Sequence, residues 1–172
     1  MSSPIRIAPA TLLPILAALL LILQAGCGYR NTASGPVALP DGRRTLFIEK
    51  IKNPTLMTSL DFRLRSLVRD ELSRRGNIRW VDADEASSVM QIEILNFTSS
   101  VTVTGSEDQT LRSAAVIVIN GTILSAADRS VLWTSGNVSA RESFVSGGEE
   151  DAEDRVIQLA VQRLVDRLAQ NY

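Results

Sequence analysis

Cys27 is the only thiol of this 172-residue chain, and its surroundings suit covalent modification better than catalysis. The residues before it include an apolar run, 12–23, without a charge, and Arg6 is the one basic residue that precedes this run. A basic start, an apolar middle and a site of small residues are typical of an export signal. As a helix the run would cover about 18 Å, against about 30 Å of bilayer hydrocarbon, so we expect a cleaved signal and no permanent span.

The site of small residues, Leu23-Gln24-Ala25-Gly26-Cys27, resembles a bacterial lipobox. The resemblance implies cleavage between Gly26 and Cys27, with a diacylglycerol thioether on the thiol and an N-acyl chain such as palmitate on the new amino terminus. The lipobox pattern has Leu three positions before the cysteine, whereas this chain has Gln24 there and Leu23 one position earlier. The alternative is an ordinary cleaved signal, which would leave a free thiol in an oxidising compartment.

Gly28 follows the cysteine, at the position where Asp would indicate retention at the inner membrane. In signals of this class Gly indicates the cell outer membrane, with the lipid-anchored domain on its periplasmic side. We therefore predict three parts: 1–26 is the cleaved lipoprotein signal peptide, 27–43 is the lipidated Cys and a short linker, and 44–172 is a single α+β domain. The linker is rich in Gly, Pro, Ala and Asn and ends in a turn signal.

The remaining side chains offer little catalytic chemistry. The chain has no histidine, which excludes Ser-His and Cys-His nucleophile pairs and the usual zinc sites. The acidic run in 149–154 lacks the spacing of a calcium loop, and carboxylates at a helix start complement the helix dipole. The 18 basic and 19 acidic residues do not give the charge balance of a nucleic-acid-binding protein. We therefore expect a non-catalytic protein with no metal, no nucleic-acid partner and no cofactor except the covalent lipid.

Two stretches have the three- and four-residue spacing of amphipathic helices. The first is followed by Gly76, at the position of a C-terminal cap, and the second begins after Gly147-Gly148. The predicted apolar stripes are Leu60, Leu64, Leu67, Val68 and Leu72 in the first helix, and Ile157, Ala160, Val161, Leu164, Val165 and Leu168 in the second. Five arginines lie off the first stripe: Arg63, Arg65, Arg69, Arg74 and Arg75.

Five segments have the composition or the alternation of strands. They are residues 45–51, 77–82, 90–103, 111–124 and 131–144. A short polar turn joins the last two, which predicts an antiparallel hairpin. The order β-α-β-β-β-β-α predicts an α+β fold, a two-layer sandwich with two amphipathic helices packed on one face of a mostly antiparallel four- to five-stranded sheet.

Five motifs follow one another along the chain. They are Gly26-Cys27-Gly28-Tyr29-Arg30 at the acylation site, 51–55 before the first helix, 76–81 after it, 128–133 at the hairpin turn and the closing helix, 152–168. In this order they resemble the lipopolysaccharide (LPS)-assembly lipoproteins of Gram-negative bacteria, the LptE family. The resemblance covers essentially the whole mature chain, with one departure at Phe144, where Tyr is expected. It implies a non-catalytic outer-membrane lipoprotein that plugs a large β-barrel LPS-assembly protein and helps it to assemble and to insert LPS into the outer leaflet.

Two other functions fit some of these features. An outer-membrane lipoprotein activator of a peptidoglycan synthase would also have an acylated cysteine and a small α/β domain. It usually needs a long disordered tether to cross the periplasm, and residues 28–43 are too few. A periplasmic enzyme fits less well, because the chain lacks histidine and any paired-carboxylate spacing.

Lipopolysaccharide carries phosphates at its lipid A end, and a guanidinium group can bind phosphate through two hydrogen bonds. Basic residues on strands or loops near the sheet are therefore candidate phosphate contacts. They are Arg43, Arg44, Lys50, Lys52, Arg112 and Arg141. The alternative for each of them is an ordinary solvated charge.

Overall fold

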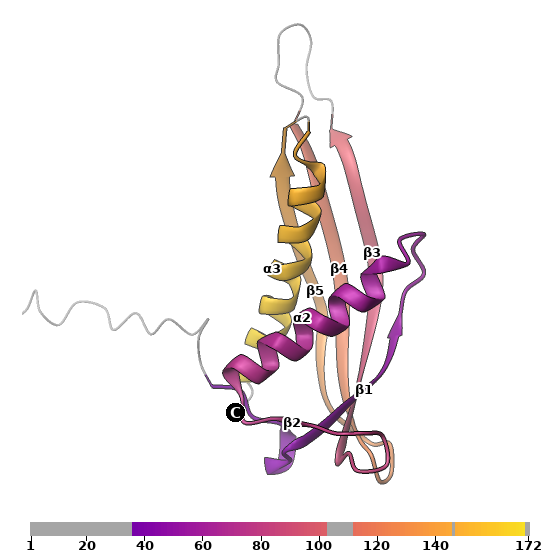
Figure 1. Ribbon diagram of the computed structural model, residues 1–172, viewed down its shortest axis with the longest axis vertical. Coiled ribbons are helices and arrows are strands. Elements are labelled where there is room, and N and C mark those ends of the chain that lie inside the picture. The colour runs from indigo at the N-terminus through magenta and orange to yellow at the C-terminus, as the bar shows by residue number, and fades with distance from the viewer. Residues whose placement is uncertain (1–35, 103–111, 146, 171–172) are drawn as a thin grey trace, which may run out of the picture. The chain divides into compact units, whose positions relative to one another are not determined.

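The computed structural model describes residues 36–102, 112–145 and 147–170, and its elements follow the predicted order (Figure 1). A short 3-10 turn, η2 (Pro40–Gly42), comes first. The strands are β1 (Thr45–Lys52), β2 (Arg79–Trp80), β3 (Ser88–Thr102), β4 (Arg112–Ser125) and β5 (Val131–Phe144), and the helices are α2 (Ser59–Arg75) and α3 (Glu149–Ala169). Within these ranges, none of the helices combines the length and the hydrophobicity that crossing a bilayer requires.

The five strands form one sheet in the order β2-β1-β3-β4-β5. The short strands β1 and β2 pair in parallel, and β1 also runs parallel to β3. The long strands β3, β4 and β5 pair antiparallel, so most of the sheet is antiparallel and the predicted hairpin is confirmed. The strand predicted at 77–82 is reduced to β2, which pairs only with Thr45 and Leu46 of β1.

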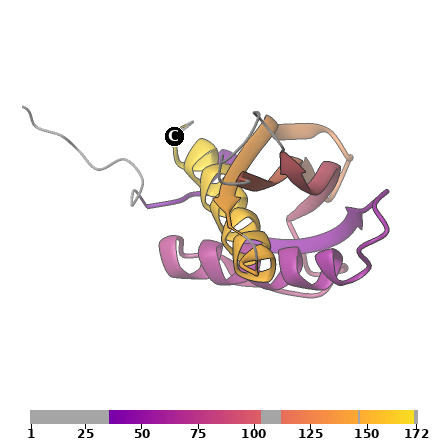
Figure 2. The same cartoon turned by 90° about the horizontal axis from the view of Figure 1, so that it is seen from above.

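Both helices cover the same face of the sheet, which confirms the two-layer α+β sandwich (Figures 1 and 2). The helix α3 packs on β4 and β5, and α2 packs on β1 and on α3. The predicted stripes are buried, except that Leu67 is only partly buried. The buried sheet residues beneath the helices are Leu46, Ile48, Met90, Ile92, Ile94, Ile117, Ile119 and Ile123. One apolar core therefore holds the two layers together.

Two glycines permit close approaches between elements. A Cβ at Gly121 of β4 would lie 2.7 Å from Cδ1 of Leu164, so α3 rests directly on the backbone of the sheet there. Gly76 ends α2, and its N–H donates to the Leu72 carbonyl at 2.9 Å. Its φ of −130° is extended and not left-handed. A Cβ there would lie 2.7 Å from the carbonyl oxygen of Val37, so the neighbouring backbone, and not the cap conformation, requires this glycine.

An ion-pair network connects the C-terminal end of α2 to α3. The side chain of Arg75 is only 7 % exposed, and its Nη1 lies 3.3 Å from Glu71 on α2 and 2.6 Å from Asp166 on α3. Glu71 also pairs with Arg74, which is 65 % exposed. The sequence placed both arginines off the apolar stripe, but only Arg74 lies toward solvent.

The other face of the sheet bears no helix in the described part of the chain, and we call it the helix-free face. Residues of β3, β4 and β5 alternate between the core and this face. Many of its side chains are short and polar, among them Thr98, Asn120, Thr122, Thr134, Asn137 and Ser139. An antiparallel sheet commonly has one packed and one solvated face.

Candidate functional site

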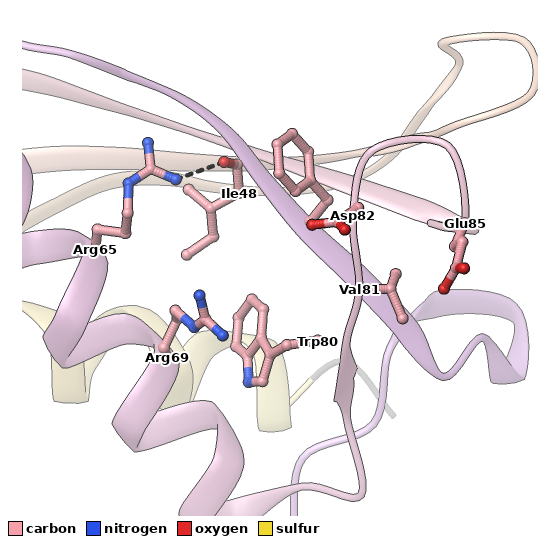
Figure 3. A pocket seen from close by; sticks show the side chains of 8 residues that line it. Ile48, Arg65, Arg69, Trp80, Val81, Asp82 and Glu85 are labelled. Atoms are coloured by element: carbon pink, nitrogen blue, oxygen red, sulfur yellow. Dashed lines mark hydrogen bonds between the residues drawn. The ribbon is translucent and has the colours of Figure 1, made fainter.

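A hollow of about 350 Å³ lies between α2, β1 and the loop that follows β2 (Figure 3). It forms because β2 ends at Trp80, so that among the described strands none pairs with this edge of β1 from Phe47 onward. Arg65 and Arg69 extend into the hollow from consecutive turns of α2 (Figure 3). Its lining consists of Phe47, Ile48, Arg65, Arg69, Trp80, Val81, Asp82 and Glu85.

Both arginines of the hollow are held by their neighbours. Nη1 of Arg65 donates to the carbonyl oxygen of Ile48 at 2.5 Å, which satisfies an acceptor on the open edge of β1. The guanidinium carbon of Arg69 lies 5.0 Å from the centroid of the Trp80 ring, within the range of a cation–π contact. Nε1 of Trp80 donates in turn to Oγ of Ser73 at 2.8 Å. These contacts cover an edge that would otherwise be open to strand pairing.

The chemistry of the hollow suits binding better than catalysis. Its two arginines are opposed by Asp82 and Glu85, both of which are exposed at the rim. Catalytic carboxylates are typically buried beside a specific charged partner, which is not the arrangement here. Across the described ranges, no group of three or more His, Cys, Asp or Glu side chains could hold a metal ion.

The predicted phosphate contacts do not converge on this hollow or on one another. Nη1 of Arg43 donates to the Ser87 carbonyl at 2.5 Å and lies 3.5 Å from Oγ of Ser125. Nε of Arg43 also lies 3.9 Å from the carboxylate of Asp41. Arg43 therefore ties the start of β1 to β3 and β4, whereas Arg44 is exposed to solvent.

Lys50, Lys52 and Arg141 lie on the helix-free face. Lys52 is opposite Glu93 in the register of β1 and β3, and its Nζ contacts the carboxylate at 2.5 Å. Arg141 is exposed on β5, where it lies opposite Val116 of β4. In the register of the sheet, Lys50 and Arg141 are separated by three strand spacings across the sheet and by about six residues along the strands. In a flat sheet this corresponds to a distance of roughly 25 Å. One phosphate group cannot contact both of them.

Three further predicted positions have no described side chain. Arg112 is the first residue of β4, where its backbone pairs with Thr102. The side chain of Arg112 lies outside the described part of the chain. Gly26 and Cys27 lie wholly outside it. Signal cleavage and acylation therefore stay predictions.

The hairpin turn between β4 and β5 carries a charged cluster that the sequence did not reveal. Nη2 of Arg129 (φ 63°) donates to both carboxylate oxygens of Glu49 on β1, at 2.9 and 2.7 Å. The hydrogen bond from Arg129 is the main reason that the pKa of Glu49 lies below its ordinary value. Hydrogen bonds from Ser125 and then Ser130 lower the pKa of Asp128 from 3.8 to about 2. The turn predicted at 128–133 is thus confirmed and is fastened to β1.

The sequence was compared with models of protein families. The model described as "Lipopolysaccharide-assembly" (LptE) matches residues 43–168. These residues begin just after η2 and end within the last turn of α3. A comparison with curated protein sequences gives no match.

One of the similar solved structures shows the same kind of fold, with a TM-score above 0.5. An uncharacterized lipoprotein B from Nitrosomonas europaea aligns with a TM-score of 0.53 at 16 % identity, over 82 % of this chain and 88 % of that one. A putative lipoprotein from Caulobacter crescentus aligns at 0.49 and 13 % identity, over 72 % and 88 % of the two chains. A minor lipoprotein from Acinetobacter baumannii gives 0.48 and 10 %, over 75 % and 92 %. At 16 % identity the likeness to the Nitrosomonas europaea lipoprotein concerns the fold alone.

Proposed function

Because the chain belongs to the lipopolysaccharide-assembly (LptE) family, we propose that it is an outer-membrane lipoprotein that plugs a large β-barrel translocon. In this role it assists assembly of the barrel, which inserts lipopolysaccharide into the outer leaflet. The observation that carries the proposal is the family match over residues 43–168, which includes the whole sheet and nearly all of α3. A match of this extent supports a role for the entire domain and not only for one motif.

The architecture is compatible with a plug that performs no catalysis. Two helices are fixed on a five-stranded sheet by one apolar core, and an ion-pair network joins the helices. A domain built in this way keeps its shape when another protein surrounds it, because close-packed interiors resist deformation. The charged groups with shifted pKa values, Glu49, Asp128 and Arg129, are on the surface and are held by partners within the turn cluster. They support the fold and form no acid–base pair aimed at a cavity.

The predicted lipid anchor would keep this domain close to the membrane. The first part of the domain is fixed at Val37, whose N–H donates to the Arg75 carbonyl at 3.0 Å. The chain from Cys27 to Val37 can therefore span at most about 35 Å. Each buried CH₂ of an acyl chain contributes about 0.8 kcal/mol, so several chains make the attachment effectively permanent. On this proposal the domain is held on the periplasmic side of the outer membrane.

Direct contact with the phosphates of lipopolysaccharide is proposed for exposed basic residues. Arg44, Lys50 and Arg141 are exposed to solvent, whereas Arg43 and Lys52 already contact protein groups. Arg112 stays a candidate by its position at the start of β4. The test is LPS binding by the purified full-length protein: Arg141→Ala and Lys50→Ala should weaken binding, and Arg155→Ala, an exposed arginine paired with Glu142 on the α3 side, should not.

The experiment that tests the function is affinity purification of the tagged, full-length protein from detergent-solubilised outer membranes. Stoichiometric recovery of one large β-barrel protein would support the proposal. Recovery of a peptidoglycan synthase in its place would contradict it and favour the synthase-activator role. A cell depleted of the protein should also show less assembled barrel and less surface lipopolysaccharide.

A further inference from the structure

Two large apolar side chains are exposed where the chain passes from β1 to α2: Leu56 in the connecting turn and Phe62 in the first turn of α2. We call these two residues the apolar tip. Leu56 is 100 % exposed and Phe62 is 77 % exposed. Both lie at the N-terminal end of α2, where the turn projects from the side of the domain (Figure 1). Single exposed apolar residues are ordinary, but grouped ones mark interaction surfaces.

Hydrogen bonds hold this turn in one conformation. Nδ2 of Asn53 donates to the Met57 carbonyl at 2.9 Å and to the carboxylate of Asp61 at 2.7 Å. Oδ1 of Asn53 accepts from the N–H and the hydroxyl of Thr55, at 3.0 and 2.6 Å. The Thr55 hydroxyl accepts in turn from the Met57 N–H at 3.3 Å. Leu56 therefore projects from a preordered turn, so that little conformational entropy remains to be lost when it is buried by a partner.

A second hollow, of about 330 Å³, adjoins Phe62 of the tip in the groove between α2 and α3. Its lining consists of Phe62, Arg63, Ser66, Leu67, Asp154 and Gln158. The two charges in this set, Arg63 and Asp154, form an ion pair with each other. The tip and the hollow together offer a projecting apolar group beside a shallow recess, which is the shape of a protein docking surface.

The charges near the tip favour a protein partner over a lipid surface. Residues 53–60 carry no charge. The basic residues that flank them, Lys52 and Arg63, are paired with Glu93 and Asp154. A membrane-surface contact typically places Lys and Arg beside apolar residues to meet anionic headgroups, and here the flanking cations already have carboxylate partners.

The chain enters the domain at the end of α2 that is remote from the apolar tip. Val37 is hydrogen-bonded to Arg75, at the end of α2 opposite to the apolar tip (Figure 1). The 17 residues of α2 cover about 25 Å. The point of chain entry and the tip therefore lie at opposite ends of α2.

We propose that the apolar tip docks into an apolar pocket on the inner wall of the β-barrel partner. This inference rests on the proposed function, which supplies the partner, and it adds the surface that makes the contact. Leu56 and Phe62 act as the buried anchors of the interface, and the paired charges around them form its polar rim.

The test compares barrel recovery by three variants of the tagged, full-length, lipidated protein from detergent-solubilised outer membranes. Leu56→Asp and Phe62→Asp each place a charge at the tip. Val131→Asp is the matched control, because Val131 is 64 % exposed at the start of β5, away from the tip. All three side chains are exposed, so thermal unfolding of each variant should match that of the wild type.

The expected result is a loss of barrel recovery of at least about tenfold in both tip variants, in the range of interface anchor residues, with wild-type recovery by Val131→Asp. If Leu56→Asp recovers as much barrel as the wild type, the inference is wrong but the proposed function still stands. The tip would then contact the bilayer, a second copy of the protein or solvent. An equal loss in Val131→Asp would overturn the inference as well. A wild-type protein that recovers no barrel would contradict the proposed function itself.

Discussion

The two ends of α2 invert the usual distribution of polar and apolar groups. At the C-terminal end, Arg75 is buried against Glu71 and Asp166, where most globular proteins would place apolar side chains. At the N-terminal end, Leu56 and Phe62 face solvent, where most proteins would place polar ones. One end of α2 is therefore tied to α3 by ion pairs in addition to its apolar packing, whereas the other end exposes the side chains that we propose contact a partner.

The middle of α2 separates these two ends and carries most of its packing. Leu60, Leu64, Val68 and Leu72 are all fully buried. Burying an aliphatic side chain contributes about 1.5–3 kcal/mol, so this stripe holds the helix on the sheet whatever happens at its ends. Changes at the ends should therefore leave the fold in place and reveal separate roles.

The largest difference is expected between two leucines on either side of the start of α2. Leu64→Ala should lower the free energy of unfolding by about 2–5 kcal/mol, because it leaves a cavity in the core. Leu56→Ala should change it by no more than about 0.5 kcal/mol, because that side chain is in solvent. Urea unfolding measures both values. Equal destabilisation would mean that the tip is part of the core.

The next effect should come from the buried charge at the other end. Arg75→Ala should lower the free energy of unfolding by about 3 kcal/mol, because it leaves Glu71 and Asp166 without their shared partner. Arg74→Ala is the control and should cost under about 1 kcal/mol, because Arg74 is mostly exposed. Equal effects of the two substitutions in urea unfolding would contradict a special role for Arg75.

A smaller effect is expected for the residue that orders the apolar tip. Asn53→Ala removes four hydrogen bonds of the turn and should lower the free energy of unfolding by about 1 kcal/mol. It should also weaken barrel recovery, because a loosened turn must be ordered again on docking. Asn77→Ala, an exposed asparagine beyond α2, is the control. Full barrel recovery by Asn53→Ala would show that preordering of the turn does not matter.

The smallest expected effect is on the pH dependence of stability, and it comes from Asp128 in the turn between β4 and β5. Asp128 has a folded pKa of about 2, below the ordinary 3.8, so its carboxylate stabilises the fold above about pH 4. That contribution is lost as the pH falls from about 4 toward 2. Asp128→Asn should reduce the slope of stability against pH in this window and leave the slope above pH 5 unchanged. An unchanged acid slope in thermal unfolding would contradict the assigned hydrogen bonds.

Much of the fold could be predicted because hydrophobic spacing reports burial. The helices and the β4–β5 hairpin follow directly from the periodicity of their apolar residues. The parallel position of β1 between β2 and β3 could not be predicted, because strand order depends on contacts distant in sequence. The shortness of β2 has a similar cause: the Ile48 carbonyl, which a longer strand could have paired with, accepts from the side chain of Arg65.

The charged surface was harder to predict, because residue type does not identify a partner. Arg74 and Arg75 look alike in the sequence, yet the first is 65 % and the second 7 % exposed. The reason is Asp166, which lies 91 residues further along the chain. The exposure of Leu56 could not be predicted either. Leu56 and Met57 are adjacent apolar residues, and the sequence does not show which of them the Asn53 turn directs toward solvent.

The most direct test of the contrast between the two ends of α2 is site-specific photo-crosslinking in intact cells. A photoreactive amino acid replaces Leu56 in one strain and Arg74, at the opposite end of the helix, in another. The expectation is that position 56 crosslinks to one large outer-membrane β-barrel protein and that position 74 does so much less. Equal crosslinking at both positions, or crosslinking of position 56 to lipid alone, would contradict it.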